Sequence, residues 1–563
     1  TAEGIVAKTF TSTRRKVSVL ADYFHSLMST RERTVRARDG EPPCYDVPSV
    51  TEVEVDSAIR RCVDGGRSPG PDGIIPEQME HTGPKARRLL GLLCYRVFAT
   101  GKWARRWKTA TVVPLHKPGR LTYSVNDFRP VQLTSIVGKF VERVLHERAT
   151  FSLGDWVDNQ FAATPGVSSS EAVGAIVADL RHGLSSKGKR NFYGRQTAAD
   201  TVSVNPLAVF IDFSDAFCHA DCSQAAAQAG ALGAPEYVQR LIASFGDGMA
   251  FQVRIGNAVS SQRMVSGGVP QGSVLGPLVF ALWTFSLNVE LRKPIQPLIP
   301  PEGVCTTCLC PAASCSSKRR VCAATPNTSA LPPSSIWMAD DLTLIVGEAS
   351  HEATIHRMQT ALDIVASWCA RHHLPISAKT QAMRFRPGGQ FTAAGRAIKS
   401  LTIGGRAVSV MTSGALRCLG IQLDAGLNFG AQVGNLCDRL RPFHSALRWI
   451  GTRLWYKRDL WFGAGVGKLS YALEHYYFAL PATTLQVLDR CYHGGIKAVT
   501  SLPQWCSKTA SRLEASMPEL AKIASAQALK FLEKAMRRPV GSLLGDLVRR
   551  PEAGGGTAVG AAL

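Results

Sequence analysis

Hydrophobic and polar positions follow two different periods along this chain. Apolar residues that recur every three or four positions predict amphipathic helices, most clearly at Ile355, Met358, Leu362, Val365 and Cys369. Short and nearly continuous apolar runs predict buried strands. Two of these runs carry acids: Leu207–Phe213 (LAVFIDF) contains Asp212, and Ile336–Val346 (IWMADDLTLIV) contains Asp340 and Asp341.

The same patterns predict further elements. The sequence Thr51–Glu54 predicts a capping box, followed by a helical stripe that includes Val55 and Ile59. Further helices are predicted over Ile136–Arg148, Val173–Leu180, Ser223–Phe245 and most of Leu436–Lys534. Strands are predicted over Thr111–Leu115, Phe251–Ile255 and Val259–Val265, with a hairpin over Leu401–Val410. Residues 185–205 and 551–563 are predicted to be an exposed loop and a disordered tail.

The charge balance indicates the kind of partner. The 563 residues include 65 Lys and Arg against 43 Asp and Glu, which gives a formal net charge of +22. This excess favours a polyanion, most simply nucleic acid, although it also fits a basic protein with no such partner. No apolar run of roughly 18–20 residues predicts a membrane span, and no signal peptide opens the chain. The first residue is Thr, so a fragment or a processed product is expected.

The 15 cysteines are mostly scattered, which favours free thiols in a reducing compartment. One group lies in a segment rich in Pro, Ser and Thr, namely Cys305, Cys308, Cys310, Cys315 and Cys322. The first four could hold a structural zinc ion, but no second pair at zinc-finger spacing follows them. The alternative is a flexible, cysteine-rich loop.

The acids on the two apolar runs predict a metal site. The second run is best interpreted as a hairpin with Asp340 and Asp341 at its tip, and a neighbouring strand would bring Asp212 beside Asp340. Carboxylates at such close range repel one another, and Mg²⁺ with substrate phosphates would compensate them. Two such ions about 4 Å apart can support an in-line phosphoryl displacement. The alternative is an ordinary turn, in which Asp is common.

The segment Ser266–Phe280 (SGGVPQGSVLGPLVF) lies between the two acidic runs. Its glycines, among them Gly268 and Gly272, allow a backbone to approach a ligand closely. Gln271 adds a side-chain amide that can both donate and accept hydrogen bonds. The alternative is a Gly-Pro turn before a buried helix.

The order of these segments resembles the reverse transcriptases of non-LTR (LINE-type) retrotransposons. The resemblance runs from about Pro48 to about Lys534. It rests on RSPGPDGI (67–74), WKTATVVPLHKPGR (107–120), NDFRPVQLTSIVGKFVERVLHER (126–148), NQFAATPGVSSSEAV (159–173), VFIDFSDAF (209–217), GGVPQGSVLGP (267–277), MADD (338–341), LPISAKTQAMRF (374–385), LRCLGIQLDAGLNF (416–429) and LDRCYHGGIKAVTSLP (488–503). This number of modest motifs in the family's order is specific.

The resemblance implies an α+β right-hand polymerase with fingers, a palm formed by an antiparallel sheet and helices, and a helical thumb. The expected divisions are an N-terminal extension (1–47), a fingers region (48–206), a palm (207–400, with a cysteine-rich insert at about 290–335), a primer-grip region (401–435), a thumb (436–540) and a flexible tail (541–563).

The resemblance also implies roles for single residues. Asp212, Asp340, Asp341 and the backbone carbonyl of Phe213 are expected to hold two Mg²⁺ ions, and Lys379 matches a lysine that can protonate pyrophosphate. Expected nucleotide contacts are Lys117, Arg129, Phe217, Gln271 and Gly272, with Phe217 against the sugar 2′ position. Lys117, Arg129 and Lys379 could instead be solvated surface charges.

The implied function is RNA-directed DNA polymerisation by a retrotransposon protein. Its partners would be an RNA template, a DNA primer or target DNA and dNTPs, inside the cell and in the nucleus. An endonuclease is expected from elsewhere in a parent polyprotein or from another subunit. The alternatives are an RNA-directed RNA polymerase and an inactive polymerase fold that only binds RNA.

Overall fold

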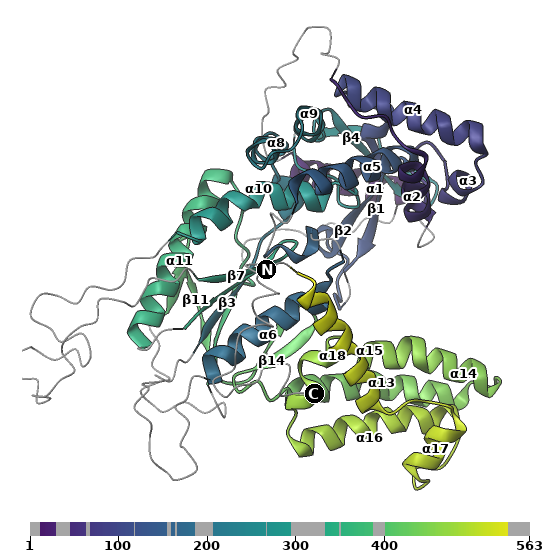
Figure 1. Ribbon diagram of the computed structural model, residues 1–563, viewed down its shortest axis with the longest axis vertical. Helices are drawn as coiled ribbons and strands as arrows, with labels where there is room; N and C mark the ends of the chain where they lie inside the picture. Colours follow the sequence, from purple (N-terminus) through teal and green to yellow (C-terminus); the bar gives the residue numbers. More distant parts are fainter. Residues whose placement is uncertain are drawn as a thin grey trace, which may run out of the picture. The chain divides into compact units, whose positions relative to one another are not determined.

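The computed structural model describes residues 12–29, 45–63, 68–117, 119–154, 159–163, 166–185, 206–265, 267–293, 333–347, 351–386 and 400–538 (Figure 1). The chain divides into two compact units, each built from segments far apart in the sequence. Unit 1 contains Thr1–Val157, Phe213–Asn288 and Cys369–Pro375, and unit 2 contains Asp158–Asp212, Val289–Trp368 and Ile376–Leu563. The predicted fingers, palm and thumb have other boundaries, which remain a prediction.

Unit 1 is built around a mixed sheet. Strand β1 (Thr109–His116) pairs antiparallel with β2 (Phe128–Leu133) and parallel with β4 (Met249–Ile255). The short strands β5 (Ala258–Val259) and β6 (Arg263–Val265) extend β4. The strands predicted over Thr111–Leu115 and Phe251–Ile255 are therefore present, whereas the one predicted over Val259–Val265 is interrupted at residues 260–262.

Helix α1 (Thr13–Met28) covers this sheet. Its buried residues Val17 and Phe24 belong to one hydrophobic cluster with Val112 and Val253 of the strands. The other helices of the unit are α2 (Glu52–Val63), α3 (Pro76–Glu80), α4 (Pro84–Thr100), α5 (Ile136–Leu153), α7 (Ala216–His219), α8 (Cys222–Ala231), α9 (Glu236–Ala243) and most of α10 (Gly276–Leu291).

Two predictions of helix ends have different outcomes. The capping box is confirmed, because the Thr51 backbone N–H donates to Glu54 Oε2 (2.8 Å) and the Glu54 N–H donates to Thr51 Oγ1 (3.2 Å). The single helix predicted over Ser223–Phe245 is wrong, since α8 ends before Gly233, whose φ of 90° is left-handed, and α9 begins after Pro235. The apolar period continues across this break, which is why the pattern alone missed it.

Unit 2 contains the sheet with both acidic runs. Strand β3 (Leu207–Asp212) lies between β8 (Asp341–Val346) and β9 (Gln381–Arg384), antiparallel to both. Strand β7 (Ser334–Met338) completes the predicted hairpin with β8, and β12 (Val410–Met411) pairs parallel with β9 at the other edge. The sheet is antiparallel except at this last edge.

Helices and hairpins cover the sheet of unit 2. Ile176 and Leu180 of α6 (Ser169–Ser185) belong to one buried cluster with Ala208, Ile336 and Ile345 of the strands. Helix α11 (His351–His372) forms where the helical period predicts it. The predicted hairpin is present as β10 (Leu401–Ile403) and β11 (Arg406–Val408), and a second one follows as β13 (Ala415–Cys418) and β14 (Ile421–Asp424).

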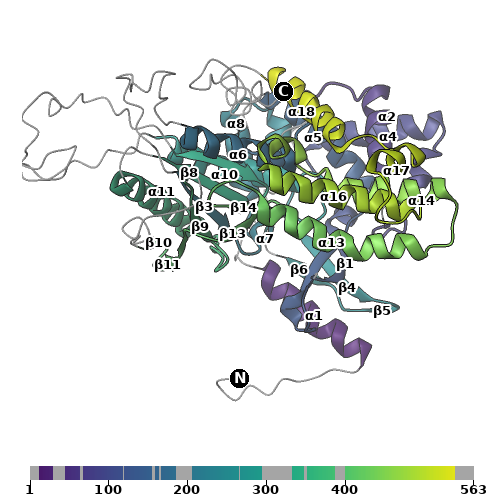
Figure 2. The same cartoon turned by 90° about the horizontal axis from the view of Figure 1, so that it is seen from below.

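The C-terminal part of unit 2 is helical, as predicted. It comprises α13 (Gly430–Trp449), α14 (Leu454–Leu460), a π-helical turn (Trp461–Val466), α15 (Gly467–Leu469), α16 (Ala482–Val499), α17 (Lys508–Glu514) and α18 (Leu520–Met536). Helices α13 and α16 lie side by side in both ribbon views (Figure 2). Trp461 is fully buried, and a Cβ on Gly465 or Gly495 would lie 1.9 or 2.2 Å from its ring, so both positions require glycine.

The elements together confirm the predicted α+β class. In the described part of the chain, no helix is both long enough and apolar enough to cross a bilayer.

Candidate active site

Three aspartates meet at one end of the unit 2 sheet. In the β3–β8 register Asp212 lies directly opposite Asp341, and Met338 of β7 lies opposite Asp341 on the other side. Ala339 and Asp340 form the two-residue turn between β7 and β8. Directly opposed residues of an antiparallel pair point to the same face with Cβ atoms about 5 Å apart. The predicted convergence of the two runs is present, but the cross-strand neighbour of Asp212 is Asp341 rather than Asp340.

A pocket of about 370 Å³ opens at this end of the sheet. The strands and the β13–β14 turn contribute its lining, which consists of Phe210, Ile211, Asp212, Asp341, Leu342, Thr343, Lys379, Gln381, Arg417, Cys418, Leu419 and Gly420. Acidic and basic side chains therefore share one cavity wall. Such a lining suits a ligand that carries both phosphates and metal ions.

The carboxylates affect one another's ionisation. Burial of the carboxyl group raises the pKa of Asp341 to about 6, and the negative charges of Asp340 and Asp212 add to the rise, while Lys379 opposes it. The residue as a whole is nevertheless exposed, so a solute can reach it. The site thus concentrates negative charge where solvent and ligands have access.

A hard divalent cation would compensate the repulsion among these three acids. Among the described residues, no three His, Cys, Asp or Glu side chains already form a closed metal cage. Mg²⁺ does not need one, because it is usually held by one or two carboxylates, substrate phosphates and waters. Asp212, Asp340 and Asp341 are therefore suitable ligands for it. The cysteines considered for zinc (Cys305, Cys308, Cys310 and Cys315) lie outside the described residues.

The turn that carries Lys379 is anchored to Asp212. The Ser377 N–H donates to the Asp212 carbonyl oxygen (2.8 Å), and the Asp212 N–H donates to Thr380 Oγ1 (3.4 Å). Within the turn, the Lys379 N–H donates to Ser377 Oγ (3.2 Å). The backbone beside the ammonium group is thus fixed relative to one of the acids, which explains why Lys379 lines the same pocket.

The buried side-chain amide of Gln160 is hydrogen-bonded to the turn that carries Asp340. Gln160 is almost fully buried, and its Nε2 donates to the Ala339 carbonyl (3.1 Å) while its Oε1 accepts from the Ala339 N–H (3.0 Å). Ala339 has a φ of 57°, a left-handed conformation that is unfavourable for alanine. The side-chain amide of the neighbouring Asn159 donates to Ser335, and the Asn159 backbone carbonyl accepts the Trp337 N–H (2.7 Å). These bonds fix the conformation of the residue just before Asp340.

The predicted nucleotide contacts belong to unit 1. The loop before α10 is attached to β2, because the Gln132 N–H donates to the Gln271 carbonyl (3.1 Å). Gly272 has a φ of 112°, and a Cβ there would lie 3.0 Å from the Gln132 carbonyl oxygen. Gly268 has a φ of 71°, and a Cβ would lie 2.6 Å from the Cys218 carbonyl oxygen. The glycines therefore serve close backbone contacts within the protein.

Phe217 is attached to this loop. Its ring stacks on Phe280 of α10 with centroids 5.2 Å apart, and its carbonyl accepts the Val269 N–H (2.9 Å). The residue is half-buried, unlike Phe213, which is buried. Phe217 thus presents an aromatic surface whose position is set by the loop and by α10.

The two basic contacts lie on the β1–β2 hairpin. Lys117 is half-buried and its Nζ donates to the Asn126 carbonyl (2.7 Å), whereas Arg129 is exposed and lies opposite Leu115 in the strand register. Both are in positions that a phosphate could reach, but the alternative of solvated surface charge also fits them.

A buried carboxylate supports the loop. Glu142 of α5 accepts the Val274 N–H (2.6 Å) and the Leu275 N–H (3.2 Å) through one oxygen, just before α10 begins. Burial raises the pKa of Glu142 to about 7, and these two hydrogen bonds and the cations Lys139 and Arg143 counteract part of that rise. The α5 side chain therefore fixes the loop that carries Gln271 and Gly272.

Sequence reasoning missed three polar residues of these sites: Gln160, Glu142 and Arg417. Gln160 directly follows Asp158 and Asn159, and Glu142 directly precedes Arg143, so the local sequence does not mark either side chain as buried. Arg417 stands next to the β13–β14 turn, and nothing in its local pattern indicates the pocket. Only the fold connects these residues to the acids or to the loop.

The sequence of this chain matches a known protein family. Residues 115–423, more than half of the chain, match the family model described as reverse transcriptase (RNA-dependent DNA polymerase). The chain therefore belongs to the reverse transcriptase family. The matched range includes the three aspartates, Lys379 and the loop before α10. Members of this family use Mg²⁺, RNA templates, DNA primers and dNTPs.

Curated relatives indicate the branch of the family. The chain is 25% identical over 392 residues to the probable RNA-directed DNA polymerase from transposon BS of Drosophila melanogaster, covering 69% of this chain and 37% of that protein. It is 23% identical over 390 residues to the RNA-directed DNA polymerase from mobile element jockey of the same species, covering 68% and 36%. The chain thus spans little more than a third of these relatives, and the predicted resemblance to non-LTR reverse transcriptases is confirmed.

A solved structure of apo telomerase from Candida tropicalis also matches, with a TM-score of 0.35 and 8% identity over 57% of this chain and 55% of that chain. A likeness of this size supports no structural conclusion.

Proposed function

We propose that this chain extends a DNA primer along an RNA template by nucleotidyl transfer at the Asp212–Asp341 end of the unit 2 sheet. The observation that carries the proposal is the strand register, which puts Asp212 opposite Asp341 with Asp340 in the adjoining turn. Sequence reasoning from the two acidic runs and the family membership support it independently.

The acids are proposed as ligands of two Mg²⁺ ions, together with the Phe213 carbonyl. When bound, such ions lower the pKa of the attacking 3′-hydroxyl and neutralise charge on the phosphates. Lys379 shares the pocket with the acids and can hold a proton for the departing pyrophosphate. Arg417, which lines the same pocket, can bind a phosphate of the primer strand.

The residues of unit 1 are proposed to select and hold the nucleotide. Phe217 offers a rigid aromatic surface that would exclude a ribose 2′-hydroxyl. Gln271 and Gly272 present a polar backbone and an amide for the base or sugar. Lys117 and Arg129 supply positive charge for the triphosphate.

A primer-extension assay tests this function directly. The 563-residue chain is incubated with a DNA primer annealed to poly-rA, dTTP and Mg²⁺, and extension is expected only when both template and metal are present. Asp340→Ala should abolish extension and leave most nucleic-acid binding intact, because binding depends on phosphate contacts spread over a basic surface.

The same assay decides between the alternatives. Preferential use of ribonucleotides would identify an RNA-directed RNA polymerase. Tight binding without extension on any primed RNA would identify an inactive polymerase fold. Because the chain spans only part of its curated relatives, DNA cleavage at a target by another segment or subunit, and action in the nucleus, are proposed only as the setting of this activity.

A further inference from the structure

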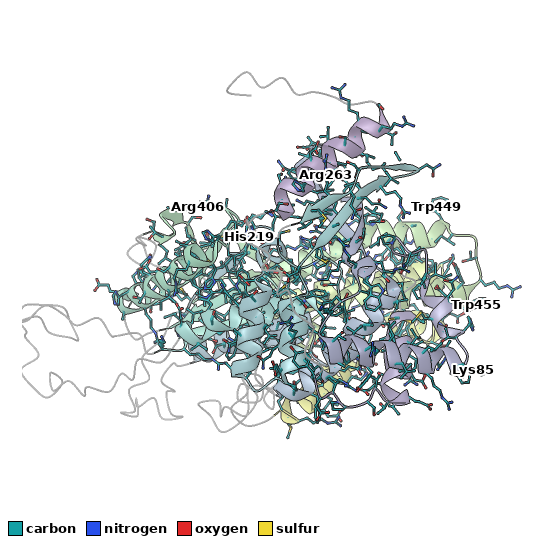
Figure 3. All side chains as sticks on the ribbon, turned by 90° about the horizontal axis from the view of Figure 1, so that it is seen from above. Lys85, His219, Arg263, Arg406, Trp449 and Trp455 are labelled. Carbon is teal, nitrogen blue, oxygen red and sulfur yellow. The ribbon has the colours of Figure 1, made fainter. Side chains whose placement is uncertain are left out.

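The C-terminal helices carry an unusual exposed aromatic surface. Trp449 is 86% exposed at the last residue of α13, and Trp455 is 54% exposed in the first turn of α14. Figure 3 labels both side chains on these consecutive helices. Tyr456 and Phe462 are also exposed large aromatics in this stretch. Several large aromatic side chains exposed in one short stretch are more informative than a single one, because exposed apolar patches mark interaction sites.

The same stretch is basic. Arg448 precedes Trp449 and Arg453 precedes the α14 aromatics, and both arginines are exposed. Within the described part of the chain, neither arginine forms an ion pair, whereas Arg458 pairs with Asp459 (3.1 Å). We call Arg448, Trp449, Arg453 and Trp455 the tryptophan–arginine surface.

The helices under this surface are anchored in the core of the unit. Leu447 is fully buried in the last turn of α13, and Lys457 is buried in α14 with its ammonium group donating to Ser501 Oγ (3.4 Å). Trp461 of the π-helical turn packs against Phe443 of α13 and Tyr492 of α16. The two exposed tryptophan rings therefore stand on the ends of packed helices, with Arg453 in the short connection between them.

We infer that the tryptophan–arginine surface binds single-stranded nucleic acid, specifically an unpaired stretch of the RNA template. Aromatic faces that stack bases, with basic side chains that meet the phosphates, are the usual composition of such sites. A protein partner would also cover the aromatic rings, but two unpaired arginines flanking them favour a polyanion. The choice of RNA over DNA rests on the proposed function, whereas the single-strand binding does not.

Fluorescence anisotropy with a labelled, unstructured oligouridine tests this inference. The double variant Trp449→Ala/Trp455→Ala should bind the oligonucleotide roughly tenfold more weakly or worse, since each stacked base contributes substantially to affinity. Trp449→Phe/Trp455→Phe should retain most of the affinity because stacking survives. Arg448→Gln/Arg453→Gln should make the dependence of affinity on salt shallower, by about one unit of slope for each phosphate that the variant no longer binds.

The chain supplies a matched control. Trp505 is 85% exposed in the same unit, and the nearest cation that follows it, Lys508, pairs with Asp489. Trp505→Ala should leave oligouridine affinity unchanged. Thermal melting checks that every variant remains folded.

Two results would overturn the inference. Wild-type affinity in the double alanine variant would show that the rings do not contact the RNA. Loss of self-association in that variant, seen by sedimentation with RNA binding unchanged, would assign the surface to a second copy of the chain. Extension of a short pre-annealed primer-template is measured in parallel: if the chain binds oligouridine through these rings but never extends a primer, the surface stands and the proposed function fails.

Discussion

Two carboxylates, Asp341 in unit 2 and Glu142 in unit 1, have a raised pKa for the same first reason, which is burial. The pKa of Asp341 is about 6 and that of Glu142 is about 7. Their neighbours differ completely. Asp341 faces two further acids in an open pocket, whereas Glu142 is enclosed and accepts two backbone N–H groups.

The difference shows that a raised pKa does not by itself identify a catalytic acid. Among the described residues, Lys379 is the cation that opposes the raised pKa of Asp341, so a metal ion can supply further compensation. The charge at Glu142 is already used to hold a loop. A buried carboxylate whose neighbours are other acids is a candidate for catalysis or metal binding. A buried carboxylate that accepts hydrogen bonds from backbone N–H groups is a candidate for a structural support.

The largest expected effect comes from removing the acids. Asp212→Asn or Asp340→Asn should reduce primer extension by about 10³-fold or more, because metal-assisted charge stabilisation supplies several kcal/mol of the barrier reduction. Steady-state rates with saturating dTTP measure this. The exposed Asp438→Asn, whose carboxylate pairs with Arg441 at 3.2 Å, is the matched control and should extend normally. Extension by either acid variant near the wild-type rate would contradict the site.

Ionisation of Asp341 should lower the stability of the folded protein as pH rises. The folded-state pKa of Asp341 lies above its ordinary value, so its neutral form is favoured by folding and stability is lost as pH increases from about 4 through about 6. Asp341→Asn should therefore melt at a higher temperature than the wild type at pH 8 and approach it near pH 4. An unchanged difference between the two proteins across this range would show that folding does not raise the pKa of Asp341.

A smaller effect is expected where an amide supports the acids. Gln160→Ala removes both hydrogen bonds to Ala339 and frees a left-handed residue next to Asp340. The rate constant kcat should fall roughly 10- to 100-fold with little change in KM for dTTP, because a misplaced metal ligand affects the chemical step. The exposed Gln486→Ala serves as control. A change in KM alone would place Gln160 outside the acid site.

Phe217 tests the unit 1 side of the comparison. Phe217→Val removes the ring that stacks on Phe280, so preference for dTTP over UTP should drop by about 10-fold or more, within the range that steric pockets supply. Competing incorporation of the two nucleotides measures the ratio. If the ratio does not change, Phe217 is only a core aromatic that packs on α10.

The sequence was sufficient for the elements and the acids but not for their supports. Repeating apolar patterns predicted β3, β7, β8 and α11, since burial of one face leaves a local periodic record. They could not give the β3–β8 register, which depends on pairing between segments more than 100 residues apart and put Asp341 opposite Asp212. Gln160 and Glu142 act through hydrogen bonds at similar separations, so no local pattern indicates their partners.

The smallest effect on activity, and the sharpest contrast with the acids, is expected at Glu142. Glu142→Gln keeps an oxygen that can accept the Val274 and Leu275 N–H groups, so extension should change only a few-fold. Glu142→Ala leaves both N–H groups unpaired and should lower the free energy of unfolding of unit 1 by about 2–4 kcal/mol. Chemical denaturation measures this, with the surface pair variant Glu147→Gln expected to cost less than about 1 kcal/mol.

The pH dependence then separates positioning from chemistry. Since the folded pKa of Glu142 is about 7, wild-type stability should fall as pH rises from about 4 through 7, by on the order of 3 kcal/mol, and Glu142→Gln should remove that slope. If Glu142 is only a support, the variant flattens the stability profile and leaves the pH profile of kcat unchanged. If the kcat profile also shifts, Glu142 takes part in proton transfer and the distinction between the two carboxylates fails.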